Sequence, residues 1–201
     1  MISRVTRRPS LVLPLSVAVA ILMLVRQERA VCEEAYPVPW KIILPTDPPQ
    51  SEGLSLYWLP SSQAELQTSS LRFSRTLAIY SQQCVRMGIV DFRTPLGKRL
   101  LGDEKPPVSV LVSPDGITIG RAENKNGVLR VEQVVKLVEA EMTARENGAK
   151  RRMDAAKEKL KSGDTEGAIR LYREVVDQKC LFPGKARDAF RELKKLGVEE
   201  R

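Results

Sequence analysis

An apolar run that turns directly into a helix start constrains the fold of this chain more than any other feature. Residues 54–59 read LSLYWL, Pro60 ends the run, and two serines and a helix-forming segment follow. Serine is a preferred N-cap, and residues 61–84 contain no proline or glycine. The pattern predicts a buried strand over 54–59 that leads into one long helix, starting at Ser61 or Ser62 and ending near Cys84.

The elements that follow are typical of an α/β domain. The predicted strands are 87–92, 108–112 and 117–121, and the predicted helices begin at Thr94 and near Val131. A strand–helix–strand unit implies parallel pairing, whereas the Pro-Asp-Gly turn before residue 117 implies antiparallel pairing. We therefore expect a mixed four-stranded sheet with helices on both faces over residues 54–146. Residues 31–53 are a proline-rich extended lead-in, in which 40–44 is a candidate edge strand.

Composition removes several classes of chemistry. The 201 residues include no histidine and three scattered cysteines, without a Cys-x-x-Cys pair. Serine or cysteine catalysis with a histidine base is therefore impossible within this chain, and neither a metal site nor another cofactor is expected.

The net charge of +8 is divided unevenly along the chain. Residues 1–30 contribute +4, residues 31–144 contribute −1, and residues 145–201 contribute +5. In the last segment the two signs alternate along predicted helices, which is typical of solvated helical faces. We therefore expect no nucleic-acid partner.

The N-terminus predicts export. Three arginines precede an uncharged apolar run over residues 11–25, and small residues follow near Ala30. This pattern predicts a signal peptide over residues 1–30, with an uncleaved anchor and membrane tether through 11–25 as the alternative. The sequence before Cys32 is a poor lipoprotein signal. The protein is expected to be periplasmic or secreted, where Cys84 and Cys180 either form a disulfide or remain buried, inert thiols; we favour the thiols.

The order of elements and the residues of the strand–helix turn resemble a thioredoxin-like domain. In that family the turn after Trp58 would carry Cys-x-x-Cys, but Ser61 and Ala64 stand at the two cysteine positions, and Pro107 matches the family's cis-proline. Disulfide exchange needs a thiolate and a second sulfur, so this site is expected to be redox-inactive. Cys84 would lie roughly 30 Å from Ser61 along an unbroken helix, which is too far for it to replace the missing cysteines. The resemblance leaves an extended-peptide groove as the use of this site, formed by Trp58, Pro60, Ser61, Ala64 and Pro107.

Residues 149–197 resemble one tetratricopeptide repeat followed by a further helix. Residues 146–148 are expected to end the preceding helix, and a Gly-Asp pair forms the turn between the two repeat helices. The packing positions that match the repeat are Ala156, Gly163, Ala168 and Tyr172. A lone repeat cannot bury its apolar face. It is therefore either a helical cap docked on the first domain or a pair of helices that binds a partner.

These features together predict an exported, redox-inactive thioredoxin-like protein that binds another protein or an extended peptide, as an adaptor or assembly factor in the bacterial cell envelope. The alternative is an atypical thiol-disulfide oxidoreductase or peroxidase relative that uses Cys84 or Cys180. A membrane-tethered structural protein that keeps its leader is a third interpretation.

Overall fold

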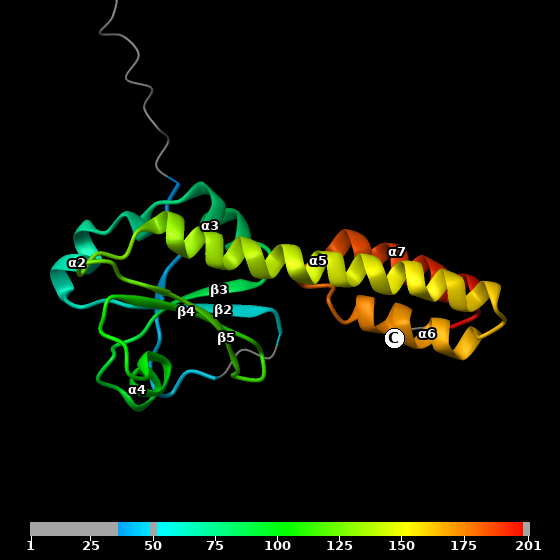
Figure 1. Cartoon of the computed structure of the whole chain (residues 1–201), viewed down its shortest axis with the longest axis horizontal. Helices are drawn as coiled ribbons and strands as arrows, with labels where there is room; N and C mark the ends of the chain where they lie inside the picture. Colours follow the sequence, from blue (N-terminus) through cyan, green and yellow to red (C-terminus); the bar gives the residue numbers. More distant parts are fainter. Residues whose placement is uncertain (1–35, 49–51, 199–201) are drawn as a thin grey trace, which may run out of the picture. The chain divides into compact units, whose positions relative to one another are not determined.

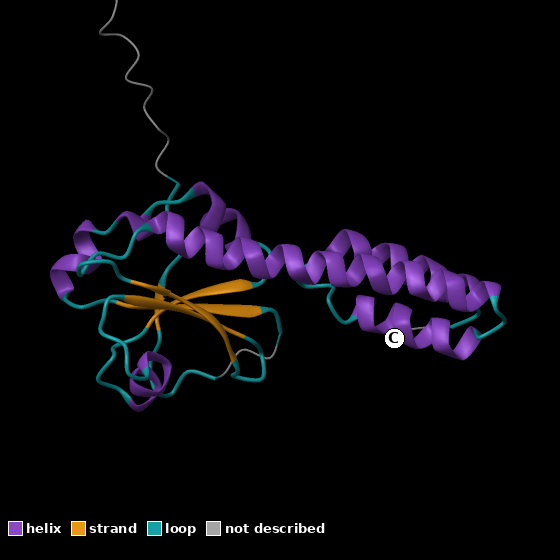
Figure 2. Ribbon diagram, viewed as in Figure 1, coloured by secondary structure: helices purple, strands orange, loops and turns teal. Residues whose placement is uncertain are grey.

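The centre of the fold is a mixed five-stranded sheet with strand order β1-β3-β2-β4-β5 (Figure 2). The computed structural model describes residues 36–48 and 52–198. The strands are β1 (Lys41–Ile42), β2 (Leu54–Leu59), β3 (Val85–Ile89), β4 (Val108–Val112) and β5 (Thr118–Glu123). β3 is parallel to β1 and β2, and β4 is antiparallel to β2 and β5. The four predicted strands all form, and the candidate edge strand adds the fifth. The predicted leader and Cys32 lie outside the described residues.

Each face of the sheet has its own hydrophobic core because strand side chains alternate between faces. On one face, Leu54, Leu56 and Trp58 pack with residues of α3 (Arg75–Ser81) and α5 (Val131–Lys161). On the other, Leu59 and the valines of β4 pack with Leu100 of α4 (Pro95–Leu101). Helices therefore cover both faces, as the sequence predicted (Figure 1).

The prediction of one long helix after β2 is wrong. The segment folds instead as α2 (Gln63–Thr68), a 3₁₀ turn η1 (Ser70–Arg72) and α3. Serine side chains form new N-caps at both breaks, Ser69 for η1 and Ser74 for α3. The lead-in also pairs with this segment, since the Val38 N–H donates to the Arg72 carbonyl and the Ser74 N–H donates to the Tyr36 carbonyl, both at 2.9 Å. That pairing requires extended backbone, which a continuous helix lacks.

The predicted helix end at residues 146–148 is also wrong, because α5 continues through it as one 31-residue helix. Its buried positions extend along the helix, from Val134 and Met142 against the sheet to Ala149 and Ala156 against α6 (Thr165–Val176) and α7 (Pro183–Lys195). A glycine inside a helix costs only about 1 kcal/mol relative to alanine. Packing on both sides of Gly148 is enough to keep the helix continuous.

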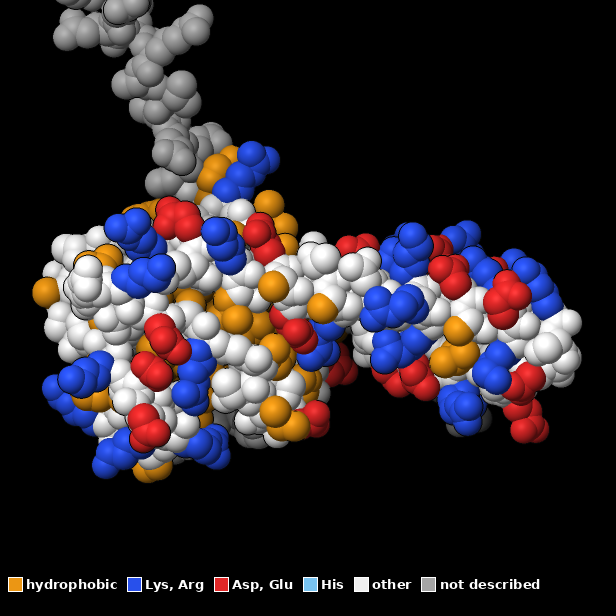
Figure 3. All heavy atoms as spheres, in the orientation of Figure 1, with side chains coloured by type: hydrophobic (Ala, Val, Ile, Leu, Met, Phe, Trp, Pro, Cys, Tyr) orange, Lys and Arg blue, Asp and Glu red, His pale blue; other side chains and the backbone are white. Residues whose placement is uncertain are grey.

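The last three helices pack together around small residues. Of the four expected packing positions, Ala156, Ala168 and Tyr172 are buried in this cluster, together with Ala189 and Leu193 of α7, whereas Gly163 is exposed. Small side chains allow helix axes to approach closely, and the larger Tyr172 fills the space between them. Figure 3 shows acidic and basic side chains interspersed on the outer surface of these helices.

The turn between α5 and α6 has the conformation that its sequence requires. Gly163 adopts φ +82°, and Asp164 caps α6 by accepting a 2.8 Å hydrogen bond from the Gly167 N–H. A hydrogen bond from the Lys159 side chain, followed by the one from the Gly167 backbone, lowers the pKa of Asp164 below its ordinary value of 3.8. Within the described ranges no helix is both long and apolar enough to cross a membrane.

Candidate functional site

The turn from β2 into α2 is closed by its own side chains. Ser62 is the N-cap of α2, and its hydroxyl accepts a 3.3 Å hydrogen bond from the Glu65 N–H. The Glu65 carboxylate accepts hydrogen bonds from the Ser61 N–H and the Ser61 hydroxyl, both at 2.7 Å, and from Trp58 Nε1 at 3.3 Å. The positive end of the helix thus already has a carboxylate partner from the same chain.

This arrangement leaves little chemistry for Ser61. Its hydroxyl donates to Glu65, and a serine nucleophile needs a general base that the chain lacks in the form of histidine. Ala64 is exposed and has no polar group. The sequence identified both positions, but it missed Glu65, whose place three residues after Ser62 is the spacing of a capping box. Glu65 reaches back to Ser61 rather than to the N-cap.

Pro107 lies at the start of β4, and the peptide bond between Pro106 and Pro107 is cis. The side chain of Asn124 holds this loop, since Nδ2 donates to the carbonyls of Lys105 at 2.8 Å and Pro107 at 3.2 Å. The sequence predicted no role for Asn124. An asparagine directly after a strand is common in turns, so no local signal distinguishes this role.

The five residues expected to form a peptide groove differ in their exposure to solvent. Trp58, Pro60 and Pro107 are buried, whereas Ser61 and Ala64 are exposed. The ring of Trp58 packs edge-on against Trp40, with centroids 5.5 Å apart, so it supports the core. A nearby cavity of about 370 Å³ is lined by Pro60 and Ser61 together with residues from β1 and the end of β3, and Pro107 does not line it.

A disulfide joins Cys84 and Cys180, with Cα atoms 5.7 Å apart. The interpretation of two inert thiols, favoured from the sequence, is therefore replaced by the bridge. Cys84 follows α3 with a left-handed φ of +57°, and Cys180 lies between α6 and α7. Because the helix before Cys84 is broken twice, the distance expected from an unbroken helix does not apply. The bridge fixes the α6–α7 connection to the sheet, where the adjacent Leu181 is buried in the main core.

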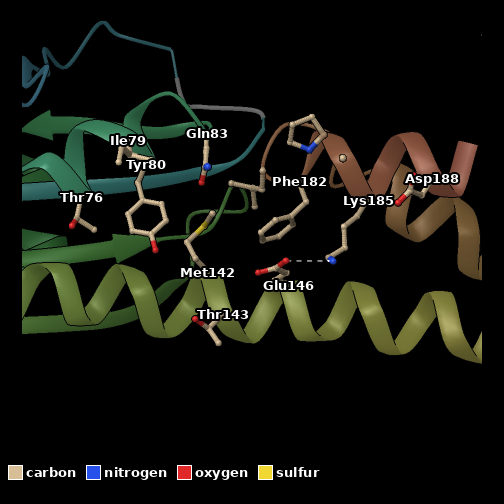
Figure 4. A pocket seen from close by; sticks show the side chains of 13 residues that line it. Thr76, Ile79, Tyr80, Gln83, Met142, Thr143, Glu146, Phe182, Lys185 and Asp188 are labelled. Atoms are coloured by element: carbon tan, nitrogen blue, oxygen red, sulfur yellow. Dashed lines mark ion pairs between the residues drawn. The ribbon is translucent and has the colours of Figure 1, made fainter.

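Beside this connection, α3, α5 and the start of α7 line a cleft with a volume of about 690 Å³. Figure 4 shows Tyr80 of α3 pointing toward α5, with Phe182, the residue before α7, lying between Met142 and Lys185. Lys185 Nζ lies 3.3 Å from Glu146 Oε1 across the cleft.

The cleft combines apolar walls with a polar end. Ile79 is 47% exposed, so it presents apolar surface at the edge of the cleft. Partial burial raises the pKa of Tyr80 above 10.0, and the nearby carboxylates of Glu139 and Glu146 raise it further, so its hydroxyl stays a neutral donor. Sequence reasoning missed this site, because three elements distant in sequence form it.

The disulfide between Cys84 and Cys180 agrees with the oxidising, extracytoplasmic compartment that the predicted leader implies. Among the described residues no group of three or more Cys, Asp and Glu side chains is arranged to hold a metal ion. No model of a known protein family matches the chain, and no curated protein matches it either.

Proposed function

We propose that this chain is an exported, redox-inactive protein with a thioredoxin-like domain and a tetratricopeptide-like helical extension, and that it binds another protein in the cell envelope. The observation that carries the proposal is the turn from β2 into α2. It has the strand–turn–helix form of a thioredoxin site, yet it holds Ser61 and Ala64 instead of cysteines and is closed by Glu65.

The positions of the two described cysteines support the proposal that this protein does not carry out dithiol exchange. Both described cysteines are used in the Cys84–Cys180 bridge, which joins segments 96 residues apart in sequence. Dithiol exchange of the thioredoxin kind depends on two sulfurs at a helix N-terminus. Here neither sulfur is at the start of α2 or α3, which favours a structural role for the bridge.

The helical extension supports a binding function through the cleft. α5 packs against both the sheet and the last two helices, α6 and α7. The disulfide and Leu181 fix the α6–α7 connection to the sheet, which favours the docked-cap interpretation. Docking creates the cleft, whose volume is within the range typical of binding pockets. An apolar side chain of a partner segment would contact Ile79 and Phe182 there, and its backbone or polar groups would contact Tyr80 and Lys185.

The test is capture of envelope proteins by the full chain and by single variants. Deleting the C-terminal helices is unsuitable, because a cut at residue 149 would divide α5 and remove Cys180. Ile79→Asp places a charge on the cleft wall and should abolish capture of the specific partner. The matched control is Ile117→Asp, a 65% exposed apolar position on the β4–β5 hairpin, which should leave capture unchanged. Equal capture by both variants would contradict the role of the cleft.

An insulin-reduction assay separates this proposal from the oxidoreductase alternative. The intact protein should show no turnover above the uncatalysed rate with a small-molecule reductant. Turnover that disappears in Cys84→Ser would establish the enzyme instead, with the Cys84–Cys180 bridge as its redox centre.

A further inference from the structure

Two exposed aromatic rings, each covered by an arginine, lie where the lead-in pairs with the segment before α3. Tyr36 is 38% exposed and Phe73 is 45% exposed. The guanidinium carbon of Arg75 lies 5.5 Å from the centre of the Tyr36 ring, and that of Arg72 lies 5.3 Å from the centre of the Phe73 ring. We call these four residues the Arg-aromatic patch. None of them lines the cleft.

The backbone holds the patch together. Pro37 and Phe73 form an antiparallel bridge, and the hydrogen bonds from Val38 to Arg72 and from Ser74 to Tyr36 flank it. Both aromatic residues therefore lie on one short ladder, and Arg75 begins the helix that follows. The surface is built by tertiary pairing rather than by one flexible loop.

The charges of the patch are not neutralised by carboxylates of the described residues. Neither arginine takes part in an ion pair there, and the one side-chain hydrogen bond from Arg72 goes to the Gln67 carbonyl at 2.7 Å. Both guanidinium groups therefore keep donors for an external anion. An arginine stacked on a ring presents charge and apolar surface side by side.

The sequence places a membrane-seeking segment close to this surface. Ten residues, 26–35, lie between the apolar run over 11–25 and Tyr36. The eleven residue steps from residue 25 to Tyr36 span at most about 40 Å when fully extended, so a chain anchored by residues 11–25 keeps Tyr36 within about that distance of the anchor. Tyrosine is enriched at the membrane interface, and arginine is attracted to anionic headgroups.

We propose that the Arg-aromatic patch docks onto the headgroups of an anionic membrane while residues 11–25, retained as an anchor, hold the chain there. A single weak membrane signal gives only reversible binding, and two signals together give stable placement. The patch is the second signal, and it sets which side of the domain faces the lipid. Each arginine near an anionic surface contributes about fivefold to the docking equilibrium, so the pair contributes about 25-fold.

The experiment uses the full chain reconstituted in vesicles of brominated phosphatidylcholine, with and without phosphatidylglycerol. Phe73→Trp places a fluorophore in the patch, and Ile117→Trp places one on the β4–β5 hairpin as the matched control. Trp40 and Trp58 contribute the same background to both variants. Bromine quenching should be at least twofold greater for Phe73→Trp than for Ile117→Trp, and only in vesicles that contain phosphatidylglycerol.

Adding Arg72→Gln and Arg75→Gln to Phe73→Trp should return quenching to the level of the control. Equal quenching of the two probes, or quenching that persists without the arginines, would overturn the proposal. No quenching of the patch probe in any vesicle would also overturn it. If Phe73→Trp lowers the melting temperature, Tyr36→Trp serves as the patch probe with the same expected results.

Discussion

Removing the Cys84–Cys180 bridge should destabilise the protein substantially while leaving its fold recognisable. The bridge joins residues 96 apart in sequence. In the chain-entropy model, closing a loop of this length in the unfolded chain removes about 4.7 kcal/mol of conformational freedom. Measured losses on removing native disulfides are about 2–5 kcal/mol, so we expect the free energy of unfolding to fall within that range.

The structure indicates what remains after reduction. The sheet core and the cluster between the last three helices contain no cysteine among their fully buried side chains, and α5 still connects them. The α6–α7 connection would be held to the sheet mainly by Leu181 and its neighbours. The reduced protein should therefore unfold at lower denaturant, with a changed slope because its unfolded chain is less compact.

The assay is urea unfolding of the oxidised protein, the reduced protein and a Cys84→Ser, Cys180→Ser double variant. Far-ultraviolet circular dichroism reports on the helices, and tryptophan fluorescence reports on the Trp40–Trp58 pair in the core. The double variant should match the reduced protein and should not respond to reductant. A loss below about 1 kcal/mol in both, with free thiols confirmed by mass, would refute the view that the bridge constrains the unfolded chain.

Three further predictions concern single contacts. Glu65→Ala removes the acceptor of three hydrogen bonds and leaves the buried indole N–H of Trp58 without a partner. The free energy of unfolding should therefore fall by about 2 kcal/mol, and the tryptophan emission should change. An unchanged unfolding midpoint would contradict the role assigned to the carboxylate. The pKa of Asp164 is lower in the folded state than in the unfolded chain, so its carboxylate stabilises the fold above pH 4 and loses this effect as the pH falls through the folded value. The difference in melting temperature between the wild type and Asp164→Asn should therefore disappear over that range. A constant difference would be inconsistent with the ion pair between Lys159 and Asp164. Ala168→Leu overpacks the fully buried crossing of α5 and α6 and should cost about 1–3 kcal/mol, whereas Glu166→Leu on the exposed side of α6 should change the unfolding free energy little.

Local sequence patterns predicted the parts of the fold that depend on local interactions. β2 and β4 begin and end at the predicted residues, because each is a continuous apolar run bounded by proline, glycine or polar turn residues. Parallel pairing of β2 with β3 was predicted from the helix between them, and antiparallel pairing of β4 with β5 from the Pro-Asp-Gly turn. The turn at Gly163 and Asp164 was expected from the resemblance to a repeat, whereas the cap that Asp164 forms on α6 was not predicted.

The candidate site was predicted only in part. The positions of Ser61 and Ala64 at the helix start came from the sequence, but the three hydrogen bonds that Glu65 accepts depend on how the turn folds. The cleft between α3, α5 and α7 was missed entirely, because its walls come from segments about 100 residues apart that only the folded chain brings together.

The sequence by itself determined the strands, the missing thiols at the β2–α2 turn and the small residues that allow α5 and α6 to pack closely. Tertiary structure decided where helices end. The pairing of residues 36–38 with 72–74 breaks one predicted helix, and packing on both sides of Gly148 continues another. It also decided the state of Cys84 and Cys180, since a disulfide depends on the approach of two chain segments and not on the residues around either cysteine.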